Sequence, residues 1–183
     1  MKRFKHEARS KRKNVQQTTP EIQLRDGRPD ESQDIGHLLV VAYTEYKKSM
    51  PPDRWDWYTN DMMMVRQRME DSEVIVAEID GKIAGTVTLY PPNGNHGWPT
   101  GWAGVRLLAV HPDFRGRNIG RLLMDECIRR CRERGIKTVG LHTTEEMKIA
   151  RGMYERMGFR RVAEYDFHPE PERTIYGYSL NLE

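Results

Sequence analysis

The stretch from Leu107 to Gly135, LLAVHPDFRGRNIGRLLMDECIRRCRERG, limits the folds open to this chain more than any other. It begins as a short apolar run typical of a buried strand and ends as a strongly helical run. Between them lies a turn, Arg115 to Gly120, with two arginines and two glycines. The first N–H groups of a helix lack partners within it, and together with the helix dipole they attract phosphate. The turn therefore predicts a site for a phosphate-bearing ligand, against the alternative of an ordinary surface turn.

Two common phosphate-binding sequences do not fit this turn. A Walker loop needs Gly-Lys-Ser/Thr, which the turn lacks. The dinucleotide-binding fingerprint needs Gly-x-Gly-x-x-Gly at the first strand–helix crossover, whereas this turn lies late in the chain. The ligand must therefore be held in another mode.

The rest of the chain alternates between strand and helix periodicity. Strands are expected at 21–26, 73–79, 82–90, 104–110, 137–143, 159–165 and 174–182, and helices at 31–48, 60–70, from the turn to Gly135, and 147–157. The last two strands read as a closing antiparallel pair, and DRWDWY (53–58) reads as an aromatic loop. Expected capping boxes pair Asp30 with Gln33 and Thr143 with Glu146. Hairpins mixed with strand–helix–strand crossovers predict an α+β domain with a mixed sheet and helices on its faces.

Much of the positive charge lies at the start of the chain. The chain has 30 Lys and Arg against 27 Asp and Glu, but residues 1–13 hold seven of the basic residues and one Glu, so the remainder has a net charge of −3. A basic run can bind nucleic acid or an anionic surface. We expect instead a solvated, partly disordered tail at 1–20, no nucleic-acid partner, and one folded domain over 21–183.

Composition and the two cysteines indicate the cellular compartment in which the protein is expected. Apolar residues make up 37% of the chain and charged residues 31%, and no apolar run is long enough to span a bilayer, so no membrane association is expected. Cys127 and Cys131 would share one helix face. Without neighbouring His or Cys they predict no metal site but a reduced pair packed in the core, and with it a cytoplasmic protein. A mitochondrial presequence stays open.

The motif LAVHPDFRGRNIGRLLM resembles the acetyl-CoA-binding motif of the GNAT N-acetyltransferase superfamily. ARGMYERMGFRRV resembles the second signature of that family, and the spacing and element order also match over 21–183. The resemblance implies a mostly antiparallel central sheet whose central strands splay apart to open a cleft. It also implies that acetyl-CoA, without a metal, contacts Leu108, Ala109, Val110, Arg115, Gly116, Arg117, Asn118, Ile119, Gly120 and Arg121.

The chain departs from the family motif in two places. Asn118 stands where the motif has its first glycine, and asparagine tolerates left-handed dihedrals better than most residues. Met147 stands where the second helix often begins with asparagine, so a polar contact near the pantetheine arm is expected to be missing.

The resemblance implies acetyl transfer to a primary amine of a small molecule or protein by direct attack in a ternary complex. A backbone N–H of Val110 or Leu108 would stabilise the oxyanion. Tyr154 matches the family tyrosine that supplies the proton for the thiolate. The general base stays open between His142, Glu145, a chain of waters and an amine that is already deprotonated. The alternative function is a non-catalytic module that binds CoA or associates with nucleic acid.

The acceptor site is expected between two loops that both contain tryptophan, residues 50–61 and 91–104. The first also contains Asp53, Asp56 and Asp61. An acidic and aromatic rim suits a cationic amine through charge and cation–π contact. The alternative is that these are ordinary loop residues at the edge of the domain. Whether the chain forms a homodimer stays open.

Overall fold

A computed structural model describes residues 21–94, 96–170 and 173–183. Its strands are β1 (Gln23–Asp26), β2 (Glu73–Ile79), β3 (Lys82–Tyr90), β4 (Trp102–Val110), β5 (Thr138–Thr143), β6 (Arg160–Arg161), β7 (Phe167–Glu170) and β8 (Arg173–Asn181). Its α-helices are α1 (Ser32–Tyr43), α2 (Pro52–Met63), α3 (Val65–Arg68), α4 (Ile119–Glu133) and α5 (Lys148–Arg156). The tail predicted at 1–20 lies outside the described residues, so the tail and the domain limits stay predictions.

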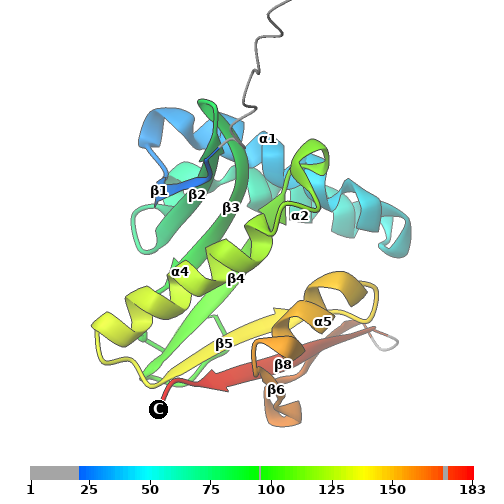
Figure 1. Cartoon of the computed structure of the whole chain (residues 1–183). Coiled ribbons are helices and arrows are strands. Elements are labelled where there is room, and N and C mark those ends of the chain that lie inside the picture. Colours follow the sequence, from blue (N-terminus) through cyan, green and yellow to red (C-terminus); the bar gives the residue numbers. More distant parts are fainter. Residues whose placement is uncertain (1–20, 95, 171–172) are drawn as a thin grey trace, which may run out of the picture.

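The strands form one sheet in the order β1-β2-β3-β4-β5-β8-β6, and β7 pairs with β8 (Figure 1). Every pairing is antiparallel except that of β4 with β5. A parallel pair needs a crossover, and here α4 provides it. The predicted α+β fold with a mostly antiparallel sheet is confirmed.

The sheet separates two apolar clusters, because alternate residues of a strand face opposite sides. On β2, Ile75 and Ala77 pack in the cluster that contains the buried face of α4, whereas Val74 and Val76 pack in the cluster under α1. Helices therefore cover both faces of the sheet, as predicted (Figure 1).

The two central strands separate part-way along their length. Pairing of β4 with β5 runs from Trp102↔Thr138 to Val105↔Leu141, although β4 continues to Val110. Beyond Val105 the side of β4 that faced β5 is open, and Figure 1 shows the two strands diverging like the arms of a V. The predicted splay is confirmed.

Two glycines, at the end of the V where β4 and β5 still pair, leave room for the indole of Trp98 to pack against the strands. Gly104 of β4 is the register partner of Gly140 of β5. The indole of Trp98 is 3% exposed, and a Cβ built on Gly140 would lie 2.4 Å from its Cδ2. A side chain on Gly140 would therefore displace the indole.

We expect Gly140→Ala to destabilise the fold by about 1–3 kcal/mol, the range for overpacking a core. Thermal and urea unfolding would measure the loss. Gly120→Ala is the control, because a Cβ there would meet its nearest atom, Val110 Cγ2, at an ordinary 3.7 Å. Equal stability of the Gly140→Ala variant and the wild type would contradict this tight packing.

A β-bulge lies in β4 just where the strand leaves β5. The register with β3 shifts between Thr86 and Thr88, and Leu107 has a left-handed φ of 53°. A bulge adds an unpaired residue and bends the strand. The bend begins at Leu107, two residues after Val105, the last residue of β4 that pairs with β5. It therefore directs the end of β4 away from β5.

Most predicted strands lie within two residues of their observed bounds, but the segment after the first helix differs. The predicted aromatic loop at 53–58 is helical and belongs to α2. Pro52 occupies the first turn of α2, where its missing N–H and fixed φ are favourable, and Trp55 and Met62 are buried on one face. The helix predicted at 60–70 is instead the end of α2 followed by α3, interrupted at Met64.

The helix predicted at 31–48 ends as an α-helix at Tyr43 and continues as a 3₁₀ helix to Ser49. Met50 is extended, as expected for a residue before proline. Neither predicted capping box forms: no side chain caps α1 at Glu31 or α5 at Met147. Thr143 instead stays in β5, paired with Tyr176.

The predicted closing pair is also shorter than expected. Residues 160–161 form β6, and the rest of the predicted strand is replaced by a 3₁₀ turn. The carboxylate of Asp166 accepts a hydrogen bond from the Gly177 N–H at 2.9 Å, which takes the place of a strand partner.

Candidate active site

The turn before α4 has the backbone that the sequence predicts for an anion site. Gly116 and Asn118 have left-handed φ values of 78° and 62°, and Asn118 is the N-cap residue of α4. The first intrahelical bond runs from the Leu122 N–H to the Asn118 carbonyl, so the N–H groups of 119–121 precede it. Asparagine thus takes the glycine-like conformation that the motif requires.

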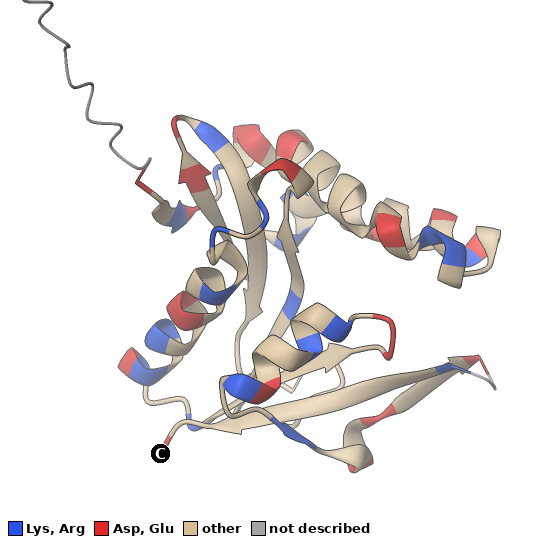
Figure 2. Cartoon of the chain, turned by 45° about the vertical axis from the view of Figure 1, so that its right-hand side comes forward, with Lys and Arg blue, Asp and Glu red and all other residues tan. Residues whose placement is uncertain are grey.

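The arginine side chains of this turn already have partners within the chain. Arg115 donates to Glu45 Oε1 at 2.8 Å and to the Ala42 carbonyl at 3.2 Å. Arg121 pairs with Asp125 at 2.9 Å, and Figure 2 shows basic and acidic residues interspersed along α4. The guanidinium of Arg117 lies 5.5 Å from the centre of the Phe114 ring. The backbone amides are therefore the groups of the turn best placed for an anion.

The open side of β4 leads from this turn into the gap of the V. The His111 N–H bonds to Ala84 of β3 at 2.9 Å, and because backbone groups alternate along a strand, those of Val110 face the gap. A Cβ on Gly120 would lie 3.7 Å from Val110 and 4.0 Å from Leu108. The structure thus brings together Leu108, Val110 and the start of α4. The side chain of Ala109 packs on the opposite face, under α1.

Tyr154 extends from α5 and is 6% exposed. Its ring packs against Phe159, with 5.9 Å between the ring centres. Burial raises the pKa of the Tyr154 phenol well above its usual value, and nearby Tyr46 and Cys127 contribute in the same direction. The hydroxyl therefore keeps its proton across the range in which enzymes work.

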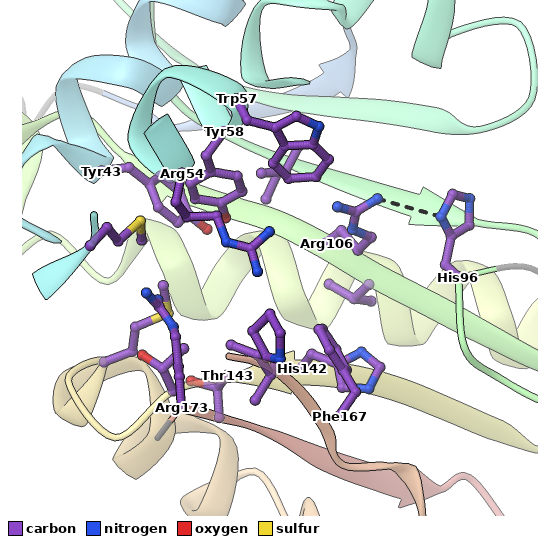
Figure 3. Close-up of a pocket in the computed structure, with 17 residues that line it drawn as sticks. Tyr43, Arg54, Trp57, Tyr58, His96, Arg106, His142, Thr143, Phe167 and Arg173 are labelled. Atoms are coloured by element: carbon purple, nitrogen blue, oxygen red, sulfur yellow. Dashed lines mark hydrogen bonds between the residues drawn. The ribbon is translucent and has the colours of Figure 1, made fainter. Parts of the chain in front are cut away.

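A pocket of about 260 Å³ lies between α2 and the strands β4, β5, β7 and β8 (Figure 3). Its walls combine aromatic, aliphatic and basic side chains. They include Tyr43, Arg54, Trp57, Tyr58, Arg106, Leu107, His142, Thr143, Phe167 and Arg173. The predicted base candidate His142 lies in this wall, whereas Glu145 is exposed and does not. Asp53, Asp56 and Asp61 are not part of this wall, although Asp61 lies 3.6 Å from its Arg106, so the acidic rim stays a prediction.

Comparison with known proteins agrees with this geometry. A model of the "Acetyltransferase (GNAT) family" matches residues 33–159, which include the turn, the V and Tyr154. The chain belongs to the GNAT acetyltransferase family.

Solved structures show the same fold at low sequence identity. A GNAT-family acetyltransferase from Staphylococcus aureus aligns with a TM-score of 0.69 and 18% identity, covering 89% of this chain and 100% of its own. The PaiA N-acetyltransferase from Thermoplasma acidophilum, in complex with coenzyme A, aligns with a TM-score of 0.70 and 13% identity, covering 86% of this chain and 98% of its own. A GNAT-family acetyltransferase from Brucella melitensis, in complex with acetyl-CoA, aligns with a TM-score of 0.62 and 20% identity, covering 89% of each chain.

His142 has the most constrained surroundings of the candidate bases in this GNAT chain. Its Nε2 lies 3.0 Å from the Tyr165 carbonyl, and its ring stacks on Trp98 with 4.4 Å between centres. A carbonyl only accepts, so Nε2 carries the proton and Nδ1 of the neutral ring is left as an acceptor. Burial lowers the pKa of His142 below its usual value, which keeps the ring neutral near pH 7.

Tyr43 and the three arginines of this pocket were not predicted from the sequence as site residues. Tyr43 donates a hydrogen bond to the Leu108 carbonyl at 3.2 Å, and its ring meets Tyr58 edge-on at 5.6 Å. In the sequence Tyr43 reads as one more apolar position of an amphipathic helix. The pocket arginines lie far apart in the chain, so no local pattern indicates that they meet.

Among residues 21–94, 96–170 and 173–183, no group of three or more His, Cys, Asp or Glu is placed to hold a metal ion. None of the helices in those ranges is long and apolar enough to cross a membrane. Cys127 and Cys131 are free and buried, and burial raises the pKa of Cys131 to about 11.

Proposed function

We propose that this GNAT protein is an N-acetyltransferase that transfers the acetyl group of acetyl-CoA to a primary amine by direct attack in a ternary complex. The observation that carries the proposal is the V between β4 and β5, open beyond Val105 and Leu141. The turn before α4 lies beside it, and the pocket is lined by both strands. A cofactor and an acceptor could therefore meet at one point from two directions.

The donor site of this proposal uses the backbone more than side chains. The amides from Arg115 to Arg121, including Gly116, Arg117, Asn118, Ile119 and Gly120, would hold the pyrophosphate of CoA. Pantetheine would run along Leu108, Ala109 and Val110 and pair with the open edge of β4. The Thermoplasma and Brucella neighbours, which contain coenzyme A and acetyl-CoA, support this ligand.

The chemistry then needs three groups beside the thioester. A backbone N–H of the open edge, that of Val110 or Leu108, would stabilise the developing oxyanion. Tyr154 would donate its proton to the departing sulfur. His142, neutral and with Nδ1 as an acceptor, would take the proton of the attacking amine, directly or through a water.

We expect His142→Gln to lower kcat/KM about 10²-fold, the low end for general-base catalysis, because a water can replace part of the role. In the wild type, activity should be lost as the pH falls through the pKa of His142, which burial lowers from its usual value, because the protonated ring cannot accept a proton. The variant should lack this acidic limb in a pH–rate profile. Glu145→Gln is the control and should retain both the wild-type kcat/KM and the acidic limb. An unchanged profile in the His142→Gln variant would contradict the assignment.

The function itself is tested by release of free thiol from acetyl-CoA when a panel of primary amines is added to the purified protein. We expect release that depends on both the protein and the amine. Binding of acetyl-CoA without release for any amine would favour the alternative of a non-catalytic CoA-binding module. Localisation in the cytoplasm and formation of a homodimer stay predictions.

A further inference from the structure

Three guanidinium groups from distant parts of the chain converge on the pocket. Arg54 comes from α2, Arg106 from β4 and Arg173 from β8. Figure 3 shows Arg54 and Arg173 reaching toward each other from opposite walls, with Arg106 further along, beside His96. Arginine stays charged at any pH of interest, so the three charges repel one another.

Carboxylates near these arginines do not balance their charge. Arg54 Nε pairs with Glu170 at 2.9 Å, and Arg106 lies a longer 3.6 Å from Asp61, which also faces Arg68 at 3.8 Å. Glu146 also interacts electrostatically with Arg173, so three carboxylates of the described residues lie near four arginines. None of these carboxylates is part of the pocket wall.

Among the described residues, Arg173 forms no ion pair within 4 Å, unlike Arg54 and Arg106. Its Nη1 lies 3.5 Å from the Ser49 carbonyl, and its buried Nε has no hydrogen-bond partner in the described ranges. A guanidinium has five N–H donors, and these contacts use few of them. The buried hydroxyl of Thr143, 2% exposed and in the same wall, also lacks a partner among the described residues. Both groups are typical of a site that binds an oxygen-bearing anion.

The remaining wall is apolar and partly open to solvent. Trp57 is 57% exposed and Phe167 is 47% exposed, unusual values for such large side chains. Tyr58 stacks parallel to Trp57, with 6.5 Å between the ring centres. Exposed aromatic side chains that line a concave wall suit a flat or apolar ligand body. A pocket of about 260 Å³ matches a small molecule better than a length of polypeptide.

We propose, on the basis of the N-acetyltransferase function above, that the acceptor is a small amine that carries a carboxylate or phosphoryl group and an apolar or aromatic body. Arg54 and Arg173 hold the anion, and Trp57 and Phe167 contact the body. An aromatic amino acid has this chemistry. This acceptor class replaces the cationic amine expected from the aspartates of 50–61.

The reaction of such an acceptor balances without a further reagent. The neutral amine forms a bond from nitrogen to the acetyl carbon, and the bond from that carbon to sulfur breaks. The amine loses one proton to His142, and sulfur gains one from Tyr154. The products are an N-acetylated anionic amine and free CoA thiol.

The test compares acceptors that differ only in the anion. Thiol release would be measured with phenylalanine, its phosphonate analogue (1-amino-2-phenylethyl)phosphonic acid, and phenethylamine, which has no anion. We expect at least one anionic amine to exceed phenethylamine in kcat/KM by about tenfold or more, since a hydrogen bond to a charged group is worth at least that ratio. Whether phenylalanine or its phosphonate analogue has the higher kcat/KM shows whether the pocket prefers a carboxylate or a phosphoryl group.

Variants of the arginines assign the preference to the pocket. Arg173→Met should raise KM for the anionic amine by about tenfold or more and should lower, by a similar factor, the preference in kcat/KM for the anionic amine over phenethylamine. Arg66→Met is the matched control, because Arg66 is exposed on α3 and outside the pocket, and it should change neither value. Acetylation of phenethylamine as efficient as that of both anionic amines would overturn the inference and leave the proposed function standing.

A binding measurement separates this inference from the proposed function. Calorimetry on the protein saturated with CoA would compare N-acetylphenylalanine with N-acetylphenethylamine, which needs no turnover. We expect binding of the first to be tighter and to depend on Arg173. Absence of thiol release together with this preference would overturn the transferase proposal and retain the anion site. Equal affinity for the two ligands would overturn the anion site.

Discussion

We expect Gly120→Glu to abolish acetyl-CoA binding. A Cβ on Gly120 would point toward Val110, Leu108 and Met153, at 3.7 to 4.0 Å, and so into the space between β4 and α5. A glutamate would extend further into this space. It would place a negative charge beside the amides at the start of α4 that precede its first intrahelical hydrogen bond, where the pyrophosphate is proposed to bind. Calorimetry would show the loss.

Two control variants separate charge from bulk at this position. Gly120→Gln has the size of the glutamate without its charge, and Gly120→Ala adds a methyl group at ordinary contact distance. We expect affinity to fall from Ala to Gln to Glu while all three melt close to the wild type. Unchanged affinity of the folded Glu variant would show that acetyl-CoA binds elsewhere.

The parts of the fold that the sequence predicts are those set by local periodicity. The hairpin of β2 and β3 follows from two runs of strand period around Asp80-Gly81, and α4 ends near its predicted Gly135, which has a left-handed φ of 69°. Even Asn118 could be placed, because its conformation follows from the motif and the tolerance of asparagine.

The errors and omissions have a different physical origin. The segment 53–58 is helical because Trp55 is buried in the apolar cluster under α1, a tertiary environment that aromatic and acidic composition does not reveal. The charge of the proposed acceptor pocket depends on Arg54, Arg106 and Arg173, which come from α2, β4 and β8 and meet only in the folded chain. Local acids therefore indicated a cationic acceptor, whereas the assembled pocket is the basis on which we propose an anionic one.

We expect Tyr154→Phe to lower kcat by about 10²–10⁴-fold, the range for general-acid help. The reference pKa of a phenol is about 10 and that of a thiol about 8.5, so complete proton transfer to a thiolate is uphill by roughly 2 kcal/mol. Burial raises the pKa of Tyr154 further, and a thiolate held in the same gap would experience a change of the same sign. The hydroxyl would thus strengthen a hydrogen bond as sulfur gains charge, and its proton would move late.

The matched control is Tyr178→Phe. Tyr178 is also 6% exposed, but its hydroxyl donates to Glu155 at 3.0 Å, away from the proposed reaction. Its loss should cost about 1 kcal/mol of stability and leave kcat unchanged. Tyr154→Phe should keep acetyl-CoA affinity within about twofold, because the phenyl ring still packs on Phe159. Turnover would be measured under conditions where chemistry limits the rate. A wild-type rate for the Tyr154→Phe variant there would make Tyr154 a core aromatic, and the proton would come from another group.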